Sequence, residues 1–259
     1  MAQVFSAGRK ALIVYLTAGY PEPGVDGDLA LEAIDAGADV LELGFPFSDP
    51  VADGPLIQEA SGVALRKGMT LSGTLQLAAW VRERRQAPIV LMGYANPVYH
   101  MGYEAFADGL ARAGGDGAII PDLPMEAAAP LRTEMRDRGL ALIPMAAPNT
   151  PASRLRTIIG QGDGFLYVVS MAGLTGDAPG KGAGWQKVAS LAREASRLPV
   201  CVGFGIRTGR EAAEAARHAD GVIVGSAITR IIREAPGRER AREGVRRLVG
   251  ELAEAVRRG

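Results

Sequence analysis

The segment VLELGFPFSDPVADGP spans residues 40–55 and says more about the fold than any other part of the chain. It begins with an aliphatic run around Glu42, which is typical of a short buried strand. Because side chains alternate along a strand, Glu42 shares one face with Val40 and Gly44, while the leucines on either side face the other way. A carboxylate on the inner face of a buried strand must be paired, protonated or functional, since an unpaired buried charge is costly.

The second half of this segment, residues 45–55, is rich in proline and glycine and is predicted to be a loop. It carries two more carboxylates, Asp49 and Asp53. A strand-end glutamate followed by an acid-bearing loop is typical of the place where an α/β enzyme holds its chemistry. Structural alternatives exist: Glu42 paired with an arginine or with backbone N–H groups, and the two aspartates as turn formers. The spacing of the three acids together favours a functional role.

Composition limits the classes of partner. The chain has 259 residues, and 29 Lys and Arg residues balance 29 Asp and Glu residues. This balance creates no net field that would favour nucleic acid or an anionic membrane, so neither is expected as a partner. No apolar segment is long enough to cross a bilayer, and the N-terminus lacks a signal-like hydrophobic region. The one cysteine, Cys201, lies in an apolar run and is interpreted as a small buried hydrophobe. A cytoplasmic location is expected.

Apolar strand-like runs recur along the chain with helical patterns between them. The eight predicted strands cover residues 11–16, 40–44, 89–92, 117–120, 141–145, 165–170, 200–203 and 221–224. Helices are expected at residues 25–36, 56–66, 72–84, 103–113, 126–138, 151–159, 185–196, 210–217 and 238–258. This alternation predicts a single (β/α)8 TIM barrel with a parallel eight-stranded core, spanning residues 1–259. A doubly wound sheet is the alternative, but residues 17–20, after the first strand, are not the glycine-rich fingerprint of that fold.

Three local features are also expected. Thr150 is a plausible N-cap of the helix that follows it. His100 is placed in a loop and His218 near a helix end, so the two histidines are too far apart to build a metal cluster, and no metal site is expected. The arginine-rich face of the C-terminal helix is interpreted as solvated.

Glycine-containing loops follow the last two predicted strands, at residues 203–206 (GFGI) and 225–228 (GSAI). In TIM barrels phosphate often binds at the loops after strands seven and eight. Glycines let backbone N–H groups approach an anion, and Ser226 opens a helix whose N-terminus favours negative charge. Two ordinary turns are the alternative, but their joint position favours a phosphate site. The glycine-rich loop at residues 171–184 is interpreted either as a lid or as an ordinary surface loop.

Some chemistries are disfavoured by what the sequence lacks. The lysines are Lys10, Lys67, Lys181 and Lys187, and none lies in a predicted strand near the expected site, so a Schiff-base aldolase is not favoured. Without clustered histidines, neither a metal-dependent aldolase nor a Glu–His isomerase pair is favoured. The chemistry that is left among these classes is proton transfer by carboxylates on a phosphorylated substrate. Composition and spacing do not name that substrate.

Nine motifs of this chain closely resemble segments of one known family, the tryptophan synthase alpha subunit, in that family's order. They are TAG (17–19), LELG (41–44), PFSDP (46–50), ADGP (52–55), MGYANP (92–97), PDLP (121–124), AGLTG (172–176), GFGI (203–206) and GSAI (225–228). The resemblance therefore covers nearly the whole chain.

This resemblance implies a barrel that cleaves indole-3-glycerol phosphate into indole and glyceraldehyde 3-phosphate without a cofactor. It implies that Glu42 is the general acid/base and that Asp53 binds the indole N–H and stabilises the positive charge developing there. Tyr167 matches a tyrosine near the reacting centre, and Thr175 matches a lid threonine thought to order the Asp53 loop. The other residues assigned to substrate binding are Gly176, Phe204, Gly205, Gly225 and Ser226.

The resemblance also implies a partner, a pyridoxal-phosphate beta subunit in an alpha2beta2 complex. The expected interface residues follow strands, which places them on the rim that holds the site: Asp49, Pro50, Asn96, Asp122 and Pro124. A stand-alone lyase that releases free indole is one alternative. A non-catalytic chain that activates a beta subunit is another, and the presence of Glu42 and Asp53 argues against it.

Two departures from the family pattern are evident. Met171 occupies a place where some family members carry Arg, so contacts that anchor a closed lid are expected to differ. The segment before Ala11 is short, so the helix that plugs the bottom of the barrel is expected to be reduced.

Overall fold

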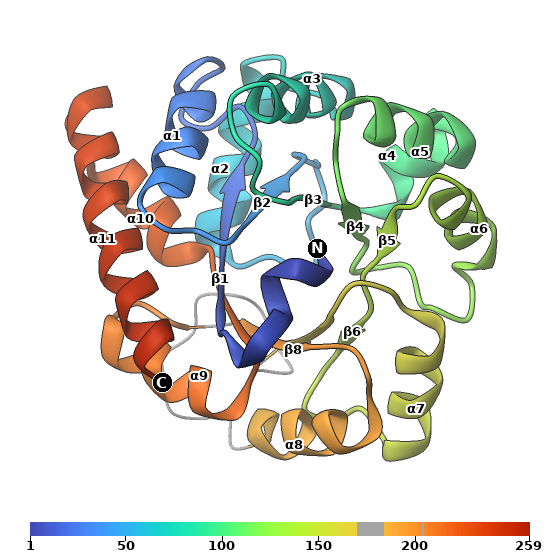
Figure 1. Ribbon diagram of the computed structural model, residues 1–259. Helices are drawn as coiled ribbons and strands as arrows, with labels where there is room; N and C mark the ends of the chain where they lie inside the picture. Colours follow the sequence, from blue (N-terminus) through green and yellow to red (C-terminus); the bar gives the residue numbers. More distant parts are fainter. Residues whose placement is uncertain (170–183, 204) are drawn as a thin grey trace.

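The computed structural model describes residues 1–169, 184–203 and 205–259, and its strands form a ring surrounded by helices (Figure 1). Neighbouring strands are parallel and follow the order β5-β4-β3-β2-β1-β9-β8-β7-β6. The strands of the described chain are β1 Ala11–Thr17, β2 Val40–Gly44, β3 Ile89–Met92, β4 Gly117–Ile119, β5 Ala141–Leu142, β6 Met145–Ala146, β7 Leu166–Val169, β8 Val200–Gly203 and β9 Gly221–Val224. This is the TIM-barrel architecture predicted from the alternation of strands and helices.

The helices lie outside the strands and pack on their apolar outer faces. They are α1 Val25–Asp35, α2 Pro55–Arg66, α3 Leu71–Arg82, α4 Ala95–Met101, α5 Tyr103–Arg112, α6 Ala129–Asp137, α7 Ala152–Gln161, α8 Trp185–Ala195, α9 Gly209–His218, α10 Ser226–Glu234 and α11 Arg238–Arg258. The 3₁₀ helix η1 Ala2–Gly8 precedes β1 and packs against the inner cluster instead. Within the described ranges, no helix is both long and apolar enough to cross a membrane.

The ninth strand arises because the fifth predicted strand, residues 141–145, is interrupted at Pro144. β5 pairs with β4, and β6 pairs with β7. Proline has no N–H to donate, so the ladder cannot run unbroken through this position. The Pro144 carbonyl still accepts a hydrogen bond from the Tyr167 N–H at 2.9 Å, and the Ile143 N–H donates to the Ala118 carbonyl at 2.9 Å. The two half-strands together therefore take the place of one strand between β4 and β7, as the eight-stranded prediction requires.

Alternation along the strands separates an inner from an outer apolar layer. On β2, Val40 belongs to the cluster inside the barrel, whereas Leu41 and Leu43 belong to the layer between strands and helices. The inner cluster collects one or two residues from each strand position: Ile13, Val40, Val90, Ile119, Ile143, Phe165, Tyr167, Cys201 and Ile223. Glu42 follows Val40 on the same face, so the predicted inward direction of its carboxyl group is confirmed. The buried apolar setting predicted for Cys201 is confirmed as well.

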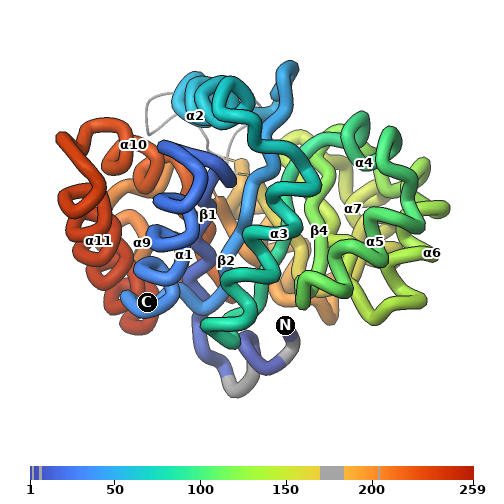
Figure 2. Tube along the Cα trace, turned by 90° about the horizontal axis from the view of Figure 1, so that it is seen from above, coloured from blue at the N-terminus to red at the C-terminus, as the bar shows by residue number. Residues whose placement is uncertain are grey.

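The N-terminal segment forms a 3₁₀ helix of seven residues that closes the bottom of the barrel. Phe5 of this helix contacts the buried ring of Phe165, with the ring centroids 5.9 Å apart. Figure 2 shows the N-terminus at the end of the barrel opposite α2. Because α2 follows the Asp53 loop directly, the plug and the acid-bearing loop lie at opposite ends.

Two local predictions about the loops are wrong. His100 lies in helix α4, not in a loop. Pro97 is the third residue of α4, where the backbone N–H has no intrahelical partner, so proline is tolerated there. Thr150 is not the N-cap of α7: Pro151 holds that position, and the Thr150 hydroxyl instead accepts the Ala147 N–H at 2.9 Å.

The solvated face predicted for the C-terminal helix is wrong in part. Two arginines of α11 bind Glu32 on α1, a carboxylate that is only 6% exposed. Arg246 Nε lies 2.5 Å from one carboxylate oxygen, and Arg242 Nη2 lies 3.2 Å from the other. These hydrogen bonds lower the pKa of Glu32, with the Arg246 bond contributing most. α11 is therefore fixed to the barrel by ion pairs as well as by its apolar face.

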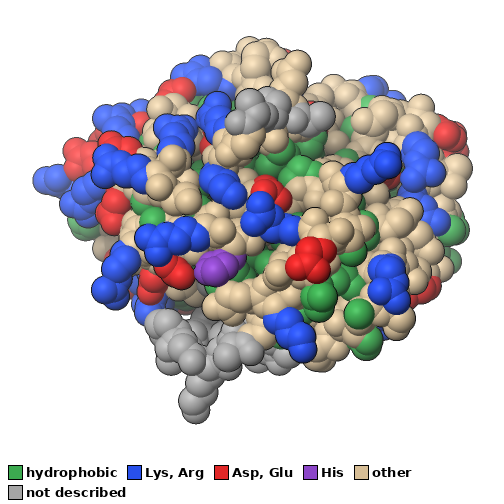
Figure 3. Space-filling model, turned by 60° about the horizontal axis from the view of Figure 1, so that its bottom comes forward, with side chains coloured by type: hydrophobic (Ala, Val, Ile, Leu, Met, Phe, Trp, Pro, Cys, Tyr) green, Lys and Arg blue, Asp and Glu red, His purple; other side chains and the backbone are tan. Residues whose placement is uncertain are grey.

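Surface charge elsewhere agrees with the neutral composition. On the face shown in Figure 3, basic and acidic side chains are interspersed rather than gathered into patches of one sign. That face therefore offers no electrostatic footprint for a nucleic acid.

Phe165 is a direct test of the closed interior. We expect Phe165→Ala to lower the free energy of unfolding by about 3–5 kcal/mol, because the fully buried ring would leave a cavity that its neighbours cannot fill. Phe5→Ala, in the partly exposed plug, is the matched control and should cost less. Urea unfolding of both variants measures this, and equal losses would contradict a packed interior closed by the plug.

Candidate active site

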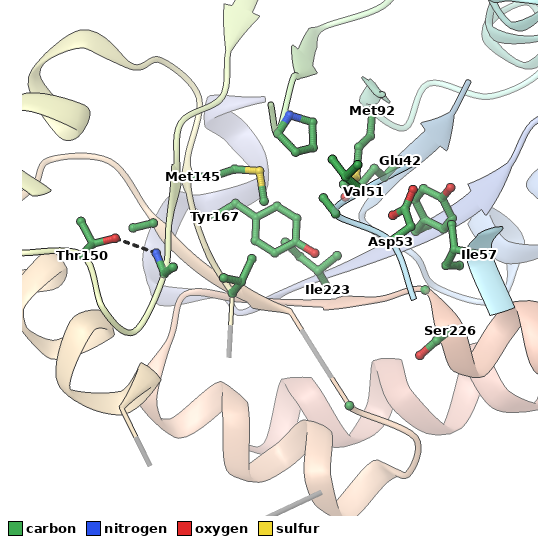
Figure 4. Close-up of a pocket in the computed structure, with 18 of the residues that line it drawn as sticks. Glu42, Val51, Asp53, Ile57, Met92, Met145, Thr150, Tyr167, Ile223 and Ser226 are labelled. Atoms are coloured by element: carbon green, nitrogen blue, oxygen red, sulfur yellow. Dashed lines mark hydrogen bonds between the residues drawn. The ribbon is translucent and has the colours of Figure 1, made fainter. Parts of the chain in front are cut away.

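A cavity of about 700 Å³ opens at the carboxyl ends of the strands. Its wall includes Glu42, Asp53, Tyr167, Gly205, Gly225 and Ser226. Residues from β2, from β7 and from three separate loops thus meet at one place, because the carboxyl ends of parallel strands all face one rim. Figure 4 shows Glu42, Asp53 and Tyr167 around this cavity, with Ser226 at its side. Of the residues predicted to act on substrate, these six are brought together. Thr175, Gly176 and Phe204, as well as Met171, lie outside the described residues.

Glu42 is placed by the strand register. It lies beside Tyr15 of β1 and Val90 of β3, and its side chain is 1% exposed. Its Oε2 atom has no hydrogen-bond partner in the described chain. Burial raises the pKa of Glu42 to about 8, and the nearby charge of Asp53 adds to the rise. The carboxyl group is therefore mostly protonated at neutral pH and is able to donate a proton.

Asp53 is held by its own loop and by a tyrosine from the next one. Its backbone N–H donates to the Pro50 carbonyl at 3.0 Å, and its carbonyl accepts from Gln58 Nε2 at 2.9 Å. Its carboxylate accepts the Tyr94 hydroxyl at 2.9 Å. Burial raises the pKa of Asp53 to about 6, and the Tyr94 hydrogen bond opposes this rise. Near neutral pH the two acids thus differ in charge, because Glu42 is buried with an oxygen that no described residue binds, whereas Asp53 is hydrogen-bonded.

Two tyrosine rings occupy space that neighbouring glycines leave free. A Cβ atom on Gly44 would lie 2.1 Å from the Tyr15 hydroxyl oxygen, and one on Gly203 would lie 2.6 Å from that of Tyr167. The glycines that end β2 and β8 are therefore required for these rings to reach the cavity. Tyr15 was missed in the sequence, although a glycine at the end of the adjacent strand is a signal that points to it.

The cavity wall between the acids and the glycine loops is apolar. It includes Ile57, Met92, Met145, Val169 and Ile223. Such a wall accommodates a flat hydrophobic ring, because the hydrophobic effect favours removing that ring from water. The ring would then lie within reach of both carboxyl groups.

The glycine loops form a further part of the wall. Gly205 adopts a φ of +66°, a left-handed conformation that other residues rarely adopt. Ser226 is the first residue of α10, so N–H groups at the start of this helix are free of intrahelical partners. Both features suit an anion such as phosphate, in agreement with the chemistry that the sequence favours.

The five residues assigned to a partner interface lie on the same rim. Asp49, Asn96, Asp122 and Pro124 are exposed, and Pro50 is half-buried. Asp122 accepts the Ala95 N–H at 2.8 Å, which ties the start of α4 to the loop after β4. Their exposure leaves them accessible to another chain.

No group of three or more metal-ligating side chains is found among the described residues. The described polar groups at the cavity include carboxyl, hydroxyl and backbone N–H groups, the amide of Asn149 and the guanidinium of Arg154. Fold and site together define a TIM-barrel protein with two buried carboxyl groups in a cavity at the carboxyl ends of its strands, beside an apolar wall and two glycine loops.

The particular family follows from comparison with known proteins. The family model described as tryptophan synthase alpha chain matches residues 1–257, and this chain belongs to that family. The tryptophan synthase alpha chain of Caulobacter sp. (strain K31) is 45% identical over 258 residues, which cover 99% of this chain and 94% of the relative. That of Chloroflexus aggregans is 46% identical over 261 residues, covering 99% and 96%.

Solved structures agree with this assignment. A structure of Mycobacterium tuberculosis tryptophan synthase superposes with a TM-score of 0.91 at 37% identity, covering 99% of this chain and 98% of the other. The tryptophan synthase subunit alpha from Legionella pneumophila str. Paris gives a TM-score of 0.90 at 36% identity, covering 98% and 95%. The resemblance found in the sequence motifs is thereby confirmed.

The raised pKa of Glu42 predicts a pH-dependent stability. Its ordinary value is 4.5 and its folded value is about 8, so the unfolded chain releases this proton first. Stability from this group is therefore lost as pH rises from about 4.5 to about 8. We expect Glu42→Gln to be more stable than wild type above this range, because the amide carries no charge, and the advantage should shrink toward about pH 5.

Urea unfolding of both proteins across this range measures the difference. Glu104→Gln, which changes a carboxylate that is 79% exposed, is the control and should show no such trend. Parallel stability curves for wild type and Glu42→Gln would contradict a buried, unpaired carboxyl group.

Proposed function

We propose that this chain, a carbon–carbon lyase of tryptophan biosynthesis, cleaves indole-3-glycerol phosphate to indole and glyceraldehyde 3-phosphate with Glu42 and Asp53 as its catalytic residues. The observation that carries the assignment of residues is the buried Glu42 carboxyl group, which lines the cavity and lies near Asp53, and whose Oε2 atom has no hydrogen-bond partner among the described residues. An acid kept neutral near pH 7 is the form needed to protonate a carbon atom.

Glu42 serves two proton transfers in this proposal. It first donates its proton to the indole carbon that carries the glycerol phosphate chain, which leaves a positive charge on the ring nitrogen. The resulting carboxylate then accepts the proton of the adjacent substrate hydroxyl. As the carbon–carbon bond breaks, its electron pair returns to the ring, the hydroxyl carbon becomes an aldehyde, and Glu42 is protonated again. Both protons are accounted for, and no cofactor takes part.

Asp53 stabilises the charge that appears on the ring nitrogen. An ionised carboxylate accepts the indole N–H, and this bond strengthens as the positive charge develops. The effect is large in a buried site because fixed charges interact more strongly away from water. Asp53 therefore contributes mainly to the transition state rather than to ground-state binding.

The substrate phosphate binds at the glycine loops, at Gly205, Gly225 and Ser226. Thr175, Gly176 and Phe204, which lie outside the described residues, are proposed to bind the substrate as well. Tyr167 is proposed to lie next to the reacting centre. Support comes from the left-handed Gly205, the helix start at Ser226, and the position of both on the cavity wall. Phosphate and carboxyl groups at separate parts of one cavity orient the glycerol chain between them.

A beta subunit is the partner of this chain, and we propose that it binds the rim residues Asp49, Pro50, Asn96, Asp122 and Pro124. Asp49 and Asp53 share one loop, so a partner that binds the first residue affects the position of the second. We also propose a cytoplasmic location, since the phosphorylated substrate carries charge that opposes its passage across membranes.

Indole release tests the function. The purified chain should release indole from indole-3-glycerol phosphate, and Glu42→Gln should reduce kcat by at least about 10²–10⁴-fold, the usual loss for a general acid/base. Because Gln has nearly the same shape, ligand affinity should stay close to that of wild type. Indole formation at the wild-type rate by this variant would remove Glu42 from the mechanism.

Addition of a cognate beta subunit separates an alpha subunit from a stand-alone lyase. We expect the isolated chain to be slow and the beta subunit to raise its kcat by about 5–150-fold, the range of ordinary allosteric coupling. A chain that is fast alone and unchanged by the partner would support the stand-alone alternative.

The phosphate site has its own test in Gly205→Ala. Alanine at a φ of +66° strains the backbone, so the loop should relax and its N–H groups should turn from the phosphate. We expect about 10-fold weaker binding of glycerol phosphate by calorimetry. Gly139→Ala is the matched control, because Gly139 has a φ of +71°, equal free space around its Cβ position and a site at the end of α6. Equal affinity in Gly205→Ala and wild type would place the phosphate elsewhere.

A further inference from the structure

Tyr94 is a buried residue between β3 and α4 that connects two parts of the Asp53 loop. Its side chain is 3% exposed. Its hydroxyl donates to Asp53 Oδ2 at 2.9 Å and accepts the Ala52 N–H at 3.0 Å. One hydroxyl oxygen thus binds both the carboxylate of Asp53 and the backbone immediately before it.

The Tyr94 ring is itself fixed. It stacks on Phe47, which belongs to the same loop as Asp53, with the ring centroids 5.3 Å apart and the planes at 28°. The next residue, Ala95, donates its N–H to Asp122 at 2.8 Å. The position of the hydroxyl is therefore set from both sides: by a ring contact within the Asp53 loop and by the attachment of α4 to the loop after β4.

The hydrogen bonds of the Asp53 carboxylate are unequal. Within the parts of the chain that the structure describes, Tyr94 is its one hydrogen-bond donor, and it binds Oδ2. The other oxygen, Oδ1, accepts no hydrogen bond from these residues, and Asp53 lines the cavity. Rotation of the carboxylate would break the Tyr94 bond, so this bond fixes which oxygen is left for a ligand.

We propose that Tyr94 is a positioning residue that orients Asp53 by occupying one carboxylate oxygen and leaves the other for the substrate N–H. This inference rests on the proposed role of Asp53 in charge stabilisation. It adds the group that orients the Asp53 carboxylate for that role, the Tyr94 hydroxyl. Tyr94 is not among the described residues that line the cavity, so its hydroxyl is placed behind Asp53 rather than against the substrate. Its effect reaches the reaction only through Asp53.

The same bond affects the charge of Asp53. Burial raises the pKa of Asp53, and the Tyr94 bond limits that rise by stabilising the ionised form. Loss of the hydroxyl would raise this pKa further, and the neutral acid would no longer stabilise a positive charge. Among the described residues, the other ionisable groups that face this pair are Glu42, Tyr15, Tyr167 and Asp122, and all four remain in place when only the hydroxyl is removed.

Tyr94→Phe is the direct experiment, since it removes one oxygen and keeps the ring. In the purified chain we expect kcat to fall about 10-fold or more, as for loss of a hydrogen bond to a charged group, with KM within about threefold of wild type. The acid limb of the pH profile of kcat should move to higher pH. Tyr99→Phe removes the hydroxyl of a tyrosine of α4 that is 72% exposed, and it should leave kcat and the profile unchanged.

A double-mutant cycle separates positioning from a general structural effect. If Tyr94 acts through Asp53, then adding Tyr94→Phe to Asp53→Asn should cause little loss beyond that of Asp53→Asn alone. Full additivity of the two losses would overturn the proposal, and so would an unmoved acid limb in Tyr94→Phe. Phe47→Leu is a second variant that keeps the hydroxyl but loosens the ring, and it should move the acid limb in the same direction by a smaller amount.

Failure of the proposed function would look different. In that case wild type would release no indole, or Asp53→Asn would be as active as wild type. An active wild type, an impaired Asp53→Asn and a normal Tyr94→Phe would leave the proposed function standing and reject the inference about Tyr94 alone.

Discussion

A carboxyl group inside the barrel, with one oxygen that has no hydrogen-bond partner in the described part of the chain, is the constraint on which this structure depends. Burial favours the neutral form of Glu42 and thereby creates an acid that holds its proton near neutral pH. The surroundings preserve that state, because Val40 and Val90 of the inner layer lie beside it and the plug at Phe5 closes the other end. Burial of such a group lowers the free energy of unfolding, and other contacts in the barrel must compensate for this loss.

Asp53 is buried as well, but hydrogen bonding favours its charged form. It comes from a loop rather than a strand, and the loop supplies backbone hydrogen bonds that hold it near Glu42. The hydroxyl of Tyr94 favours its charged form, so two similar acids in one cavity carry different charges. Because the charge of Asp53 adds to the rise in the pKa of Glu42, ionisation of the loop acid helps to keep the strand acid protonated. One neutral donor and one anion are what a reaction with proton transfer and a developing cation requires.

The strand ends control the shape of the cavity. Gly44 and Gly203 leave the space that Tyr15 and Tyr167 fill, so small residues on one strand set the reach of rings on its neighbour. The break at Pro144 occurs next to this wall, where Met145 and Ala146 line the cavity. Ion pairs between Glu32 and α11 hold the outer layer on the far side of the sheet. The inner faces and ends of the strands thus line the cavity, whereas their outer faces bind the helices that stabilise the barrel.

The sequence by itself determined the order of strands and helices, the inward direction of Glu42 and the position of the acid-bearing loop. These follow from alternation and from proline and glycine signals, which are local and have a fixed period. It did not reveal the bond from Tyr94 to Asp53, the place of Tyr15, the interrupted strand at Pro144 or the partner of Glu32. Each of these joins residues that are distant in the chain, or depends on a neighbouring strand. Only closure of the barrel decides which side chains meet, because register and packing set distances that no local pattern encodes.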